Sequence, residues 1–412
     1  MSVGIILNTN QKGIPLYSAG LAWDIGRESF YQFSWLPKLK LRATYGYNGN
    51  VNKSLSSYVT AFYNSASSVG LPYAQVINPP NPDLRWERVE NINLAVDIGL
   101  KNNLLNGTLE FYRKQGQDLI GTVPYAPQTG ILTFTGNTAS TETRGFDLTL
   151  NASPFKGPLQ WNIMLIVSHV NEKVTRYLTK AAAITSYLNG GYSSFPTEGK
   201  PLYGIYSYPW AGLDPANGDP QGYLNGLVSK NYSAIRTATT IDNVNYNGPA
   251  RPVWFGSWLN TLAYKAFYLS ANVVYRLGYY FRRESINYDD LLSANGGHSD
   301  YALRWQKAGD EVLTQVPSVP AATNSLRNAF YTNSDVLIEK GDHIRLQDIS
   351  AGYDIDRKTF HSLPFRHIRF YVYASNLGIL WKATKTDLDP DFPTRFSLQP
   401  PKTYALGIKI DL

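Results

Sequence analysis

The sequence lacks cysteine altogether and is poor in charge and in histidine. The absence of cysteine excludes a disulfide scaffold, a cysteine-ligated zinc site, a thiol nucleophile and an iron–sulfur cluster. The five histidines include no H-E-x-x-H spacing, which leaves little support for a metalloenzyme. Charged residues make up 17% of the 412 residues. Because roughly 25% is usual in soluble proteins, something other than a solvated charged shell must cover this surface.

Long apolar runs and blocks of like charge are missing as well. The least interrupted apolar stretch, residues 161–170, is half the length of a transmembrane helix. The net charge of +7 comes from scattered lysines and arginines, so no nucleic-acid partner is expected. No secretory signal is recognisable, because the apolar stretch 2–7 is short and has no cationic start.

What the sequence does contain is alternation with a period of two. In residues 88–100, Ile92, Leu94 and Val96 alternate with polar or small residues, which predicts a strand with one apolar and one polar face. The same pattern recurs along the chain. Twelve strands are expected, at 2–8, 14–25, 38–47, 88–100, 104–114, 141–152, 159–170, 252–264, 265–278, 341–355, 366–376 and 402–412.

The lengths of these strands and of their connections predict a transmembrane barrel. Most of the strands have about ten residues, which a tilted strand needs to cross a bilayer, whereas soluble strands average five or six. From the third strand onward the connections run 40, 3, 26, 6, 81, 0, 62, 10 and 25 residues, so long and short alternate throughout. In a membrane barrel the short turns face the periplasm and the long loops face outside. We therefore expect an all-β, antiparallel transmembrane β-barrel with long extracellular loops.

One strand departs from regular alternation. In residues 341–355, Ile344 and Leu346 are apolar at even positions, whereas Ile349 and Ala351 are apolar at odd positions. An extra residue in the strand restores the phase, so a β-bulge near Gln347 or Asp348 is expected.

Several motifs resemble one family, the SusC/RagA-type TonB-dependent transporters of the Bacteroidetes outer membrane. Residues 81–87 (NPDLRWE) are similar to its N-P-[DN]-L-x-W-E signature, and residues 210–220 (WAGLDPANGDP) are close to its long-loop motif. Its other landmarks have counterparts in the same order. They are found at 39–50, 111–119, 137–150, 344–346, 373–377, 388–390 and 401–407.

The resemblance implies which part of such a transporter the chain represents. Complete members have a signal peptide, a TonB-contacting segment and a plug ahead of a 22-stranded barrel, a class whose lumen is plugged. Residues 1–412 look like the C-terminal part of that barrel, with signal peptide, plug and TonB-contacting segment absent. The chain is therefore interpreted as a fragment or as one product of a broken gene.

By the same resemblance, the intact protein is an active importer in the cell outer membrane, not an enzyme. It would import oligosaccharides or peptides, with a SusD-like surface lipoprotein as a lid. Outer-membrane lipid surrounds the wall, and the TonB complex acts only through the missing plug portion. No cofactor, no metal and no catalytic residue is expected. Two alternatives remain open: a self-contained 12-stranded outer-membrane pore or enzyme, and a soluble carbohydrate-binding β-sandwich, since half-exposed soluble sheets alternate in the same way.

Aromatic residues in the two longest loops are the candidate ligand contacts. Sugar rings stack on aromatic faces and peptides present apolar side chains, so tyrosine and tryptophan suit either nutrient. The candidates are Tyr203, Tyr206, Tyr208, Trp210, Tyr223, Tyr288, Tyr301 and Trp305, of which Tyr206, Tyr208, Trp210, Tyr223, Tyr301 and Trp305 form the ligand-binding prediction.

Three polar motifs have structural interpretations that we favour over functional ones. Residues 81–87 are expected to fix the entry to a strand, with Trp86 at the membrane interface. Residues 213–219 could hold calcium but fit a plain turn better, with Asp214 and Asn217 bonding backbone. The acidic residues Asp387, Asp389 and Asp391 are expected to be exposed and solvated.

Overall fold

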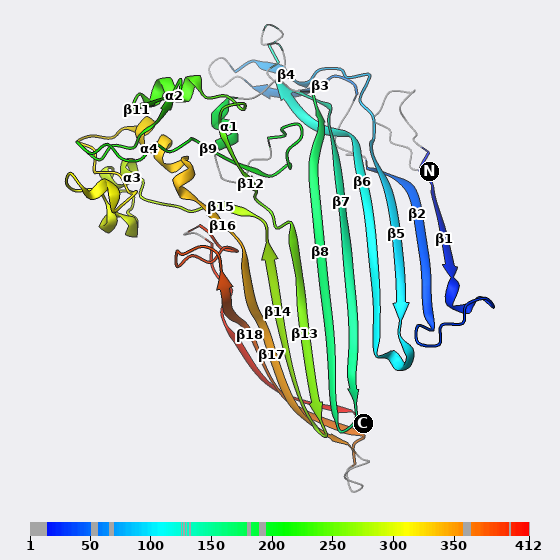
Figure 1. Ribbon diagram of the computed structural model, residues 1–412. Coiled ribbons are helices and arrows are strands. Elements are labelled where there is room, and N and C mark those ends of the chain that lie inside the picture. The colour runs from blue at the N-terminus through cyan, green and yellow to red at the C-terminus, as the bar shows by residue number, and fades with distance from the viewer. Residues whose placement is uncertain are drawn as a thin grey trace. The chain divides into compact units, whose positions relative to one another are not determined.

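The computed structural model describes most of the chain as antiparallel β-structure (Figure 1). It describes residues 15–50, 57–65, 70–124, 126, 128, 130–131, 133–178, 183–188, 195–356, 364–394 and 397–411. Among these residues, no helix is both long and apolar enough to cross a membrane. The long strands are β1 (Ser18–Asp24), β2 (Lys38–Asn50), β5 (Glu87–Gly99), β6 (Leu105–Pro124), β7 (Thr133–Lys156), β8 (Leu159–Tyr177), β13 (Trp254–Tyr264), β14 (Phe267–Leu277), β17 (His343–Asp356), β18 (His367–Lys382) and β19 (Thr403–Asp411).

These strands coincide with eleven of the twelve predicted spans, and the predicted strand 2–8 lies outside the described residues. The chain divides into two compact units, and β8 contributes residues 166–177 to the first and residues 159–165 to the second. Several strands run further than predicted. Strand β6 extends to Pro124 and β7 begins at Thr133, so the expected 26-residue loop is largely strand.

In the first unit, β1, β2, β5, β6 and β7 pair antiparallel in chain order. One face carries apolar side chains that remain exposed, such as Leu94 at 54% and Phe111 at 51%. The other face is polar: Arg42 Nε donates to Asp97 Oδ2 at 2.9 Å, and Thr108 donates to Asp97 Oδ1 at 2.8 Å. Period-two alternation thus separates an apolar face from a hydrogen-bonded polar face.

In the second unit, β13, β14, β17, β18 and β19 pair antiparallel in chain order. The apolar face is again open, with Leu269 48% and Leu406 84% exposed. On the polar face, Asn272 Nδ2 donates to Asp348 Oδ2 at 3.0 Å. A β-sandwich would bury such apolar rows against a second sheet, and these rows are exposed, so the soluble-sandwich alternative is wrong.

The predicted bulge in β17 is confirmed. The register with β14 pairs Asn272 with Asp348 but Val273 with Leu346, which leaves Gln347 as the extra residue. Because of the bulge, the side chains of Ile344 and Ile349 lie on the same apolar face, although one position is even and the other is odd.

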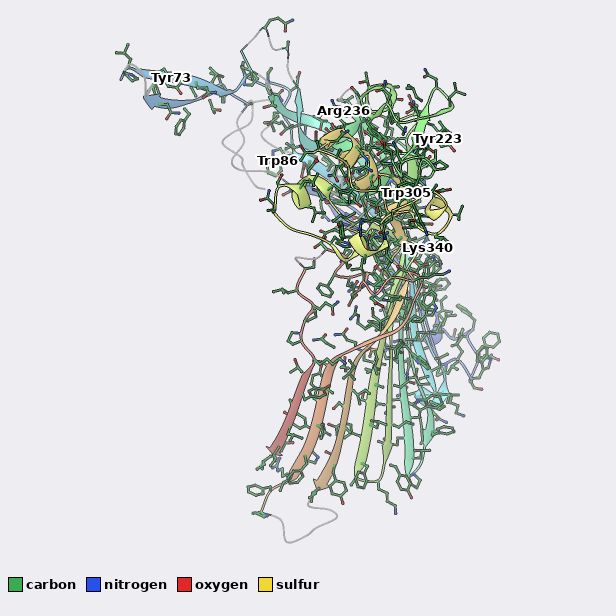
Figure 2. All side chains as sticks on the ribbon, turned by 90° about the vertical axis from the view of Figure 1, so that its left-hand side faces the viewer. Tyr73, Trp86, Tyr223, Arg236, Trp305 and Lys340 are labelled. Atoms are coloured by element: carbon green, nitrogen blue, oxygen red, sulfur yellow. The ribbon has the colours of Figure 1, made fainter. Side chains whose placement is uncertain are left out.

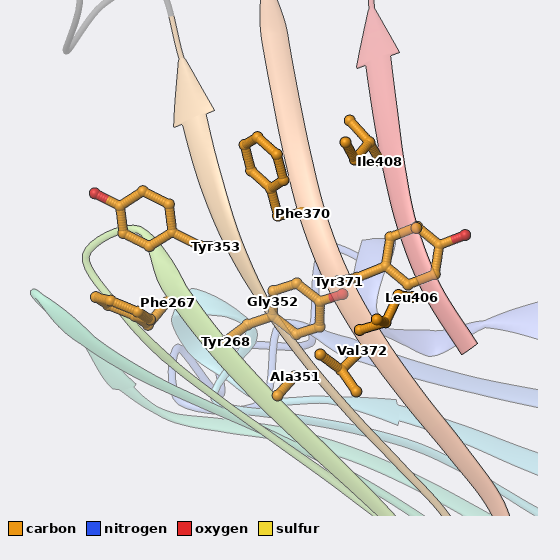
Figure 3. Close-up of a pocket in the computed structure, with 11 residues that line it drawn as sticks. Phe267, Tyr268, Ala351, Gly352, Tyr353, Phe370, Tyr371, Val372, Leu406 and Ile408 are labelled. Carbon is orange, nitrogen blue, oxygen red and sulfur yellow. The ribbon is translucent and has the colours of Figure 1, made fainter. Parts of the chain in front are cut away.

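Tyrosine rings cover glycines on neighbouring strands at three places. In the register, Tyr112 pairs with Gly145, Tyr268 with Gly352 and Tyr371 with Gly407. A Cβ atom added to these glycines would lie 2.4, 2.4 and 2.3 Å from the paired tyrosine side chain. The last two pairs border a hollow of about 830 Å³ at β14, β17, β18 and β19 (Figure 3). Ring-over-glycine packing of this kind fixes the register between strands.

The long connections of the second unit fold into small elements that share cores. We call residues 183–188, 203–249 and 279–340 the loop lobe. Its elements are α1 (Ile184–Leu188), β9 (Gly204–Ser207), β10 (Gly222–Leu224), β11 (Leu227–Ser229), α2 (Tyr232–Ala238), β12 (Asn245–Pro249), β15 (Tyr280–Arg282), α3 (Tyr288–Leu292), α4 (Ser325–Thr332) and β16 (Ile338–Lys340). In the first unit, the connection between β2 and β5 contains a hairpin of β3 (Thr60–Ser65) and β4 (Pro72–Asn78).

Candidate functional site

Asparagine caps begin α2, α3 and α4 in the loop lobe. The Asn231 side chain accepts from the backbone N–H of Ala234 at 3.1 Å, and Asn324 accepts from that of Arg327 at 3.0 Å. Such caps satisfy N–H groups that have no partner within the helix. The short helices then pack two buried clusters. The first contains Ile184, Tyr187, Leu188, Tyr206, Tyr208, Ile235, Val244 and Phe330, and the second contains Ile286, Tyr288, Val316, Tyr331 and Leu337.

Three of the six predicted ligand-binding aromatics belong to this packing. Tyr206 and Tyr208 are 3% and 4% exposed in the first cluster. Trp210 packs against both clusters, and its ring stacks on Phe330 with centroids 6.3 Å apart. These side chains build the lobe and present little surface to a ligand. Of the two further aromatics considered, Tyr288 is also buried, at 2% exposed.

The other three lie nearer the surface of the lobe. Tyr223 on β10 and Tyr301 are 45% and 38% exposed, and the Arg304 guanidinium lies 4.0 Å from the centre of the Tyr301 ring. The Trp305 ring is partly buried over Gly218, and its Nε1 donates to Glu311 at 3.2 Å. Figure 2 shows Tyr223 and Trp305 among the side chains of the lobe.

Residues 213–220 form a structural turn, as expected. Asp214 accepts from the backbone N–H of Ala216 at 2.9 Å, and Asn217 accepts from that of Asp219 at 3.1 Å. Gly218 adopts a φ of +70°, and a Cβ there would lie 2.4 Å from Trp305. Glycine is therefore required both for the backbone conformation and for the close approach of the ring.

A buried arginine fastens this turn to α4. Arg327 is 4% exposed, and its Nε donates to Asp219 Oδ1 at 2.7 Å. Its Nη2 donates to the carbonyl of Ser318 at 2.8 Å. A buried, paired arginine of this kind holds distant segments in one geometry because breaking the pair leaves an uncompensated charge. Sequence reasoning missed Arg327, since nothing local marks a partner 108 positions away.

One buried and one half-buried carboxylate of the lobe have pKa values shifted in opposite directions. Burial raises the pKa of Asp335, although Asn245 and the Trp210 backbone donate hydrogen bonds to it. Burial alone would raise the pKa of Asp300, but hydrogen bonds from the Ser285 hydroxyl and the Arg283 guanidinium have the larger effect. The pKa of Asp300 is therefore lowered. Desolvation favours the neutral acid, whereas a cation and a donor favour the carboxylate.

The acidic segment 387–391 corrects a prediction. Asp389 is 7% exposed, and the Arg345 Nη2 donates to its two carboxylate oxygens at 2.6 and 2.7 Å. Asp391 contacts Arg276 at 2.5 Å and His343 at 3.3 Å. The expectation of exposed, solvated carboxylates is wrong for both because cations on the polar face of β14 and β17 bind them. The segment is thereby fixed to that face.

Residues 81–87 fix the entry to β5, as expected. The Asn137 side chain accepts from the backbone N–H of Arg85 at 2.9 Å and donates to the Arg85 carbonyl at 2.9 Å. Arg85 also pairs with Asp118, at 2.9 Å, where β6 is irregular. Trp86 is 4% exposed, so it packs inside this junction, and the expected place at the membrane interface is wrong.

The described residues contain no group of three or more metal-ligating side chains of the kind that could hold an ion. The lobe instead offers exposed apolar side chains at its tips. Leu227 and Val228 on β11 are 74% and 55% exposed, and Val312 and Leu313 are 82% and 83% exposed. The β11 tip lies beside the exposed Tyr223, and exposed apolar tips of this kind suit noncovalent contacts with a partner or a ligand.

Comparisons with known proteins agree with this architecture. The family described as "TonB dependent receptor-like, beta-barrel" matches residues 7–377. TonB-dependent receptor P39 of Formosa agariphila is 25% identical over 400 residues, covering 84% of this chain and 37% of that protein. TonB-dependent receptor SusC of Bacteroides thetaiotaomicron is 24% identical, covering 95% of this chain and 39% of that protein. The chain thus spans about two-fifths of the length of these curated relatives.

Among solved structures, the RagAB peptide importer in its "closed-closed" state superposes with a TM-score of 0.78 at 19% identity, covering 98% of this chain and 44% of that chain. At this identity the likeness concerns the fold alone. Three features of this chain indicate the same family. They are its open-faced strands, its alternation of short turns and long loops, and the family match over residues 7–377. The chain belongs to the TonB-dependent receptor β-barrel family of the outer membrane.

Proposed function

We propose that the chain supplies barrel wall and ligand-gripping loops to an outer-membrane importer of oligosaccharides or peptides. The intact importer would also contain a plug through which TonB delivers energy. The observation that carries the proposal is the loop lobe, a packed unit on connections of the wall strands that has exposed aromatic and apolar tips. Long loops with their own core are usually functional. The family resemblance of the sequence motifs gives the proposal its substrate classes, and the RagAB structure is described as that of a peptide importer.

A SusD-like surface lipoprotein is the proposed partner of the lobe. The exposed tips at Leu227, Val228, Val312 and Leu313 are the surface that such a lid would cover. Their side chains are apolar and belong to a lobe whose core is already filled, so their burial requires a second protein. This role also explains why the tips remain apolar on an exposed surface.

Exposure divides the aromatic candidates into two roles. We assign ligand contact to Tyr223, Tyr301 and Trp305, which retain accessible ring surface. Tyr206 and Tyr208 are assigned to the packed core that supports these contact residues, because their burial leaves no ring face for a ligand.

The test uses the importer purified with its lid and two matched double variants. Tyr223→Ala with Tyr301→Ala is expected to weaken binding of malto-oligosaccharides or of a casein peptide digest by about tenfold or more, since stacked rings are worth ~1–3 kcal/mol together. Leu227→Asp with Val228→Asp is expected to release the lid in a pull-down while ligand contacts stay intact. Binding by isothermal titration at wild-type strength in the tyrosine variant, with both probes, would contradict the ligand assignment.

A further inference from the structure

A cluster of cations lies on the apolar face of the first unit. Arg113 on β6, Arg144 on β7 and Lys173 on β8 surround the carboxylate of Glu142. Their nitrogens lie 2.8, 3.0 and 3.3 Å from its oxygens. We call these four residues the cationic cluster. Three cations around one carboxylate leave the cluster with a formal charge of +2.

The register places the cluster next to the apolar rows. Phe111 pairs with Phe146, and two positions further along the same face Arg113 pairs with Arg144. Like charges directly opposite each other on neighbouring strands are normally destabilising. Two arginines in this position therefore need an anion, and Glu142 supplies only one negative charge.

The register also shows which side chains flank the cluster at the end of the apolar rows. Arg113 pairs with Ile92, and Ile92 pairs with Tyr45. Tyr45 is 40% exposed, and its ring meets the ring of Tyr47 at 5.7 Å. Aromatic rings at the end of an apolar band mark the boundary between hydrocarbon and headgroups. The arginine pair follows Phe111 and Phe146 on the side of the long loops, so we expect it near headgroup depth.

Exposure shows which part of the cluster remains available. The Glu142 side chain is 6% exposed, whereas those of Arg113, Arg144 and Lys173 are 38%, 64% and 49% exposed. The carboxylate is covered, and the cations keep N–H groups directed to their surroundings. Guanidinium groups bind phosphate with two parallel hydrogen bonds, and an ammonium adds a point charge.

From this arrangement we propose that the cationic cluster binds the phosphate headgroup of an anionic glycolipid in the outer leaflet. The lipid chains would lie along the apolar rows below, and the phosphate would supply the missing negative charge between Arg144 and Lys173. The proposal depends on the outer-membrane setting of the wall and not on what the importer carries. A negative result for the lipid site would therefore leave the transport proposal unchanged.

The test compares the protein with the double variant Arg144→Gln, Lys173→Gln in nanodiscs. This variant retains the Arg113–Glu142 pair, so the wall keeps its internal ion pair. Lys101→Gln is the matched control, because Lys101 is an exposed cation on the short turn between β5 and β6. The probes are a diphosphorylated lipid A, the same lipid without its phosphates, and inorganic phosphate alone. Bound lipid is counted by native mass spectrometry.

The unaltered protein and Lys101→Gln are expected to retain diphosphorylated lipid A, and the double variant to lose about tenfold or more of that binding, since each cation near an anionic surface contributes severalfold. Equal retention by the double variant would overturn the proposal. Equal binding of the dephosphorylated lipid would also overturn it. If inorganic phosphate displaces the lipid no better than chloride does, the result supports a lipid site. If free phosphate alone saturates the cationic cluster, the result contradicts a lipid as the source of the phosphate group.

Discussion

At the scale of single residues, carboxylates that are at least half-buried make the stability of the loop lobe depend on pH. The pKa of Asp335 is raised by burial, so its neutral form is favoured in the folded lobe. A raised folded-state pKa contributes stability that is present below the ordinary pKa of about 4 and is lost as pH rises through the folded value. Asp335→Asn is therefore expected to lessen the loss of stability between pH 4 and pH 7. The measurement is thermal unfolding by tryptophan fluorescence at both pH values.

Asp300 is the contrasting control, because its pKa is lowered. A lowered folded-state pKa contributes stability above the ordinary pKa, and that stability is lost as pH falls through the folded value. Asp300→Asn is expected to destabilise the lobe at pH 7 by ~1–3 kcal/mol, since Arg283 loses its close partner. If both variants change the pH dependence of the melting temperature between pH 4 and pH 7 in the same direction, the assignment of opposite roles to the two carboxylates is wrong.

At the scale of elements, the tyrosine–glycine pairs hold neighbouring strands in register. Gly352→Ala is expected to cost ~1–3 kcal/mol because its Cβ would lie 2.4 Å from the Tyr268 ring and 2.7 Å from the Phe370 carbonyl. Gly157→Ala is the matched control, since a Cβ there meets nothing within 4 Å. Urea unfolding of the detergent-solubilised protein measures both. Equal midpoints for the two variants would show that the ring does not pack against the glycine as described.

The elements also show what the sequence could and could not predict. Period-two alternation located every long strand among the described residues, and its phase change located the bulge at Gln347. It failed beyond residue 114, where β6 continues through polar residues, because alternation of apolar side chains disappears once a strand leaves the bilayer. The burial of Asp389 could not be predicted either, because its partner Arg345 lies 44 positions away in the sequence.

The sequence predicted which loops carry the aromatic residues, but not which of the rings are exposed. Aromatic content identified the two loops that form the lobe, yet spacing does not distinguish Tyr206, which is 3% exposed, from Tyr223, which is 45% exposed. Both are tyrosines in a long connection, and only packing against residues far along the chain buries the first. Sequence therefore predicts that such loops fold, and tertiary contacts decide which rings remain available.

At the scale of the whole molecule, the fold depends on which face of each strand meets lipid, and adjacent residues of β14 allow a direct test. Leu269 lies on the apolar face and is 48% exposed, whereas Ser270 lies on the polar face and pairs with Thr261. An arginine on the lipid face costs from about 1 kcal/mol near the interfaces to ~2–4 kcal/mol at the bilayer midplane, while lumen positions tolerate charge. Leu269 lies two residues from the turn that joins β13 to β14, so the lower end of this range applies. We expect Leu269→Arg to lower the yield of heat-modifiable, membrane-inserted protein severalfold and Ser270→Arg to leave it nearly unchanged. The comparison needs only outer-membrane fractions run on gels with and without heating, and the reverse order of yields would assign the two faces the other way round.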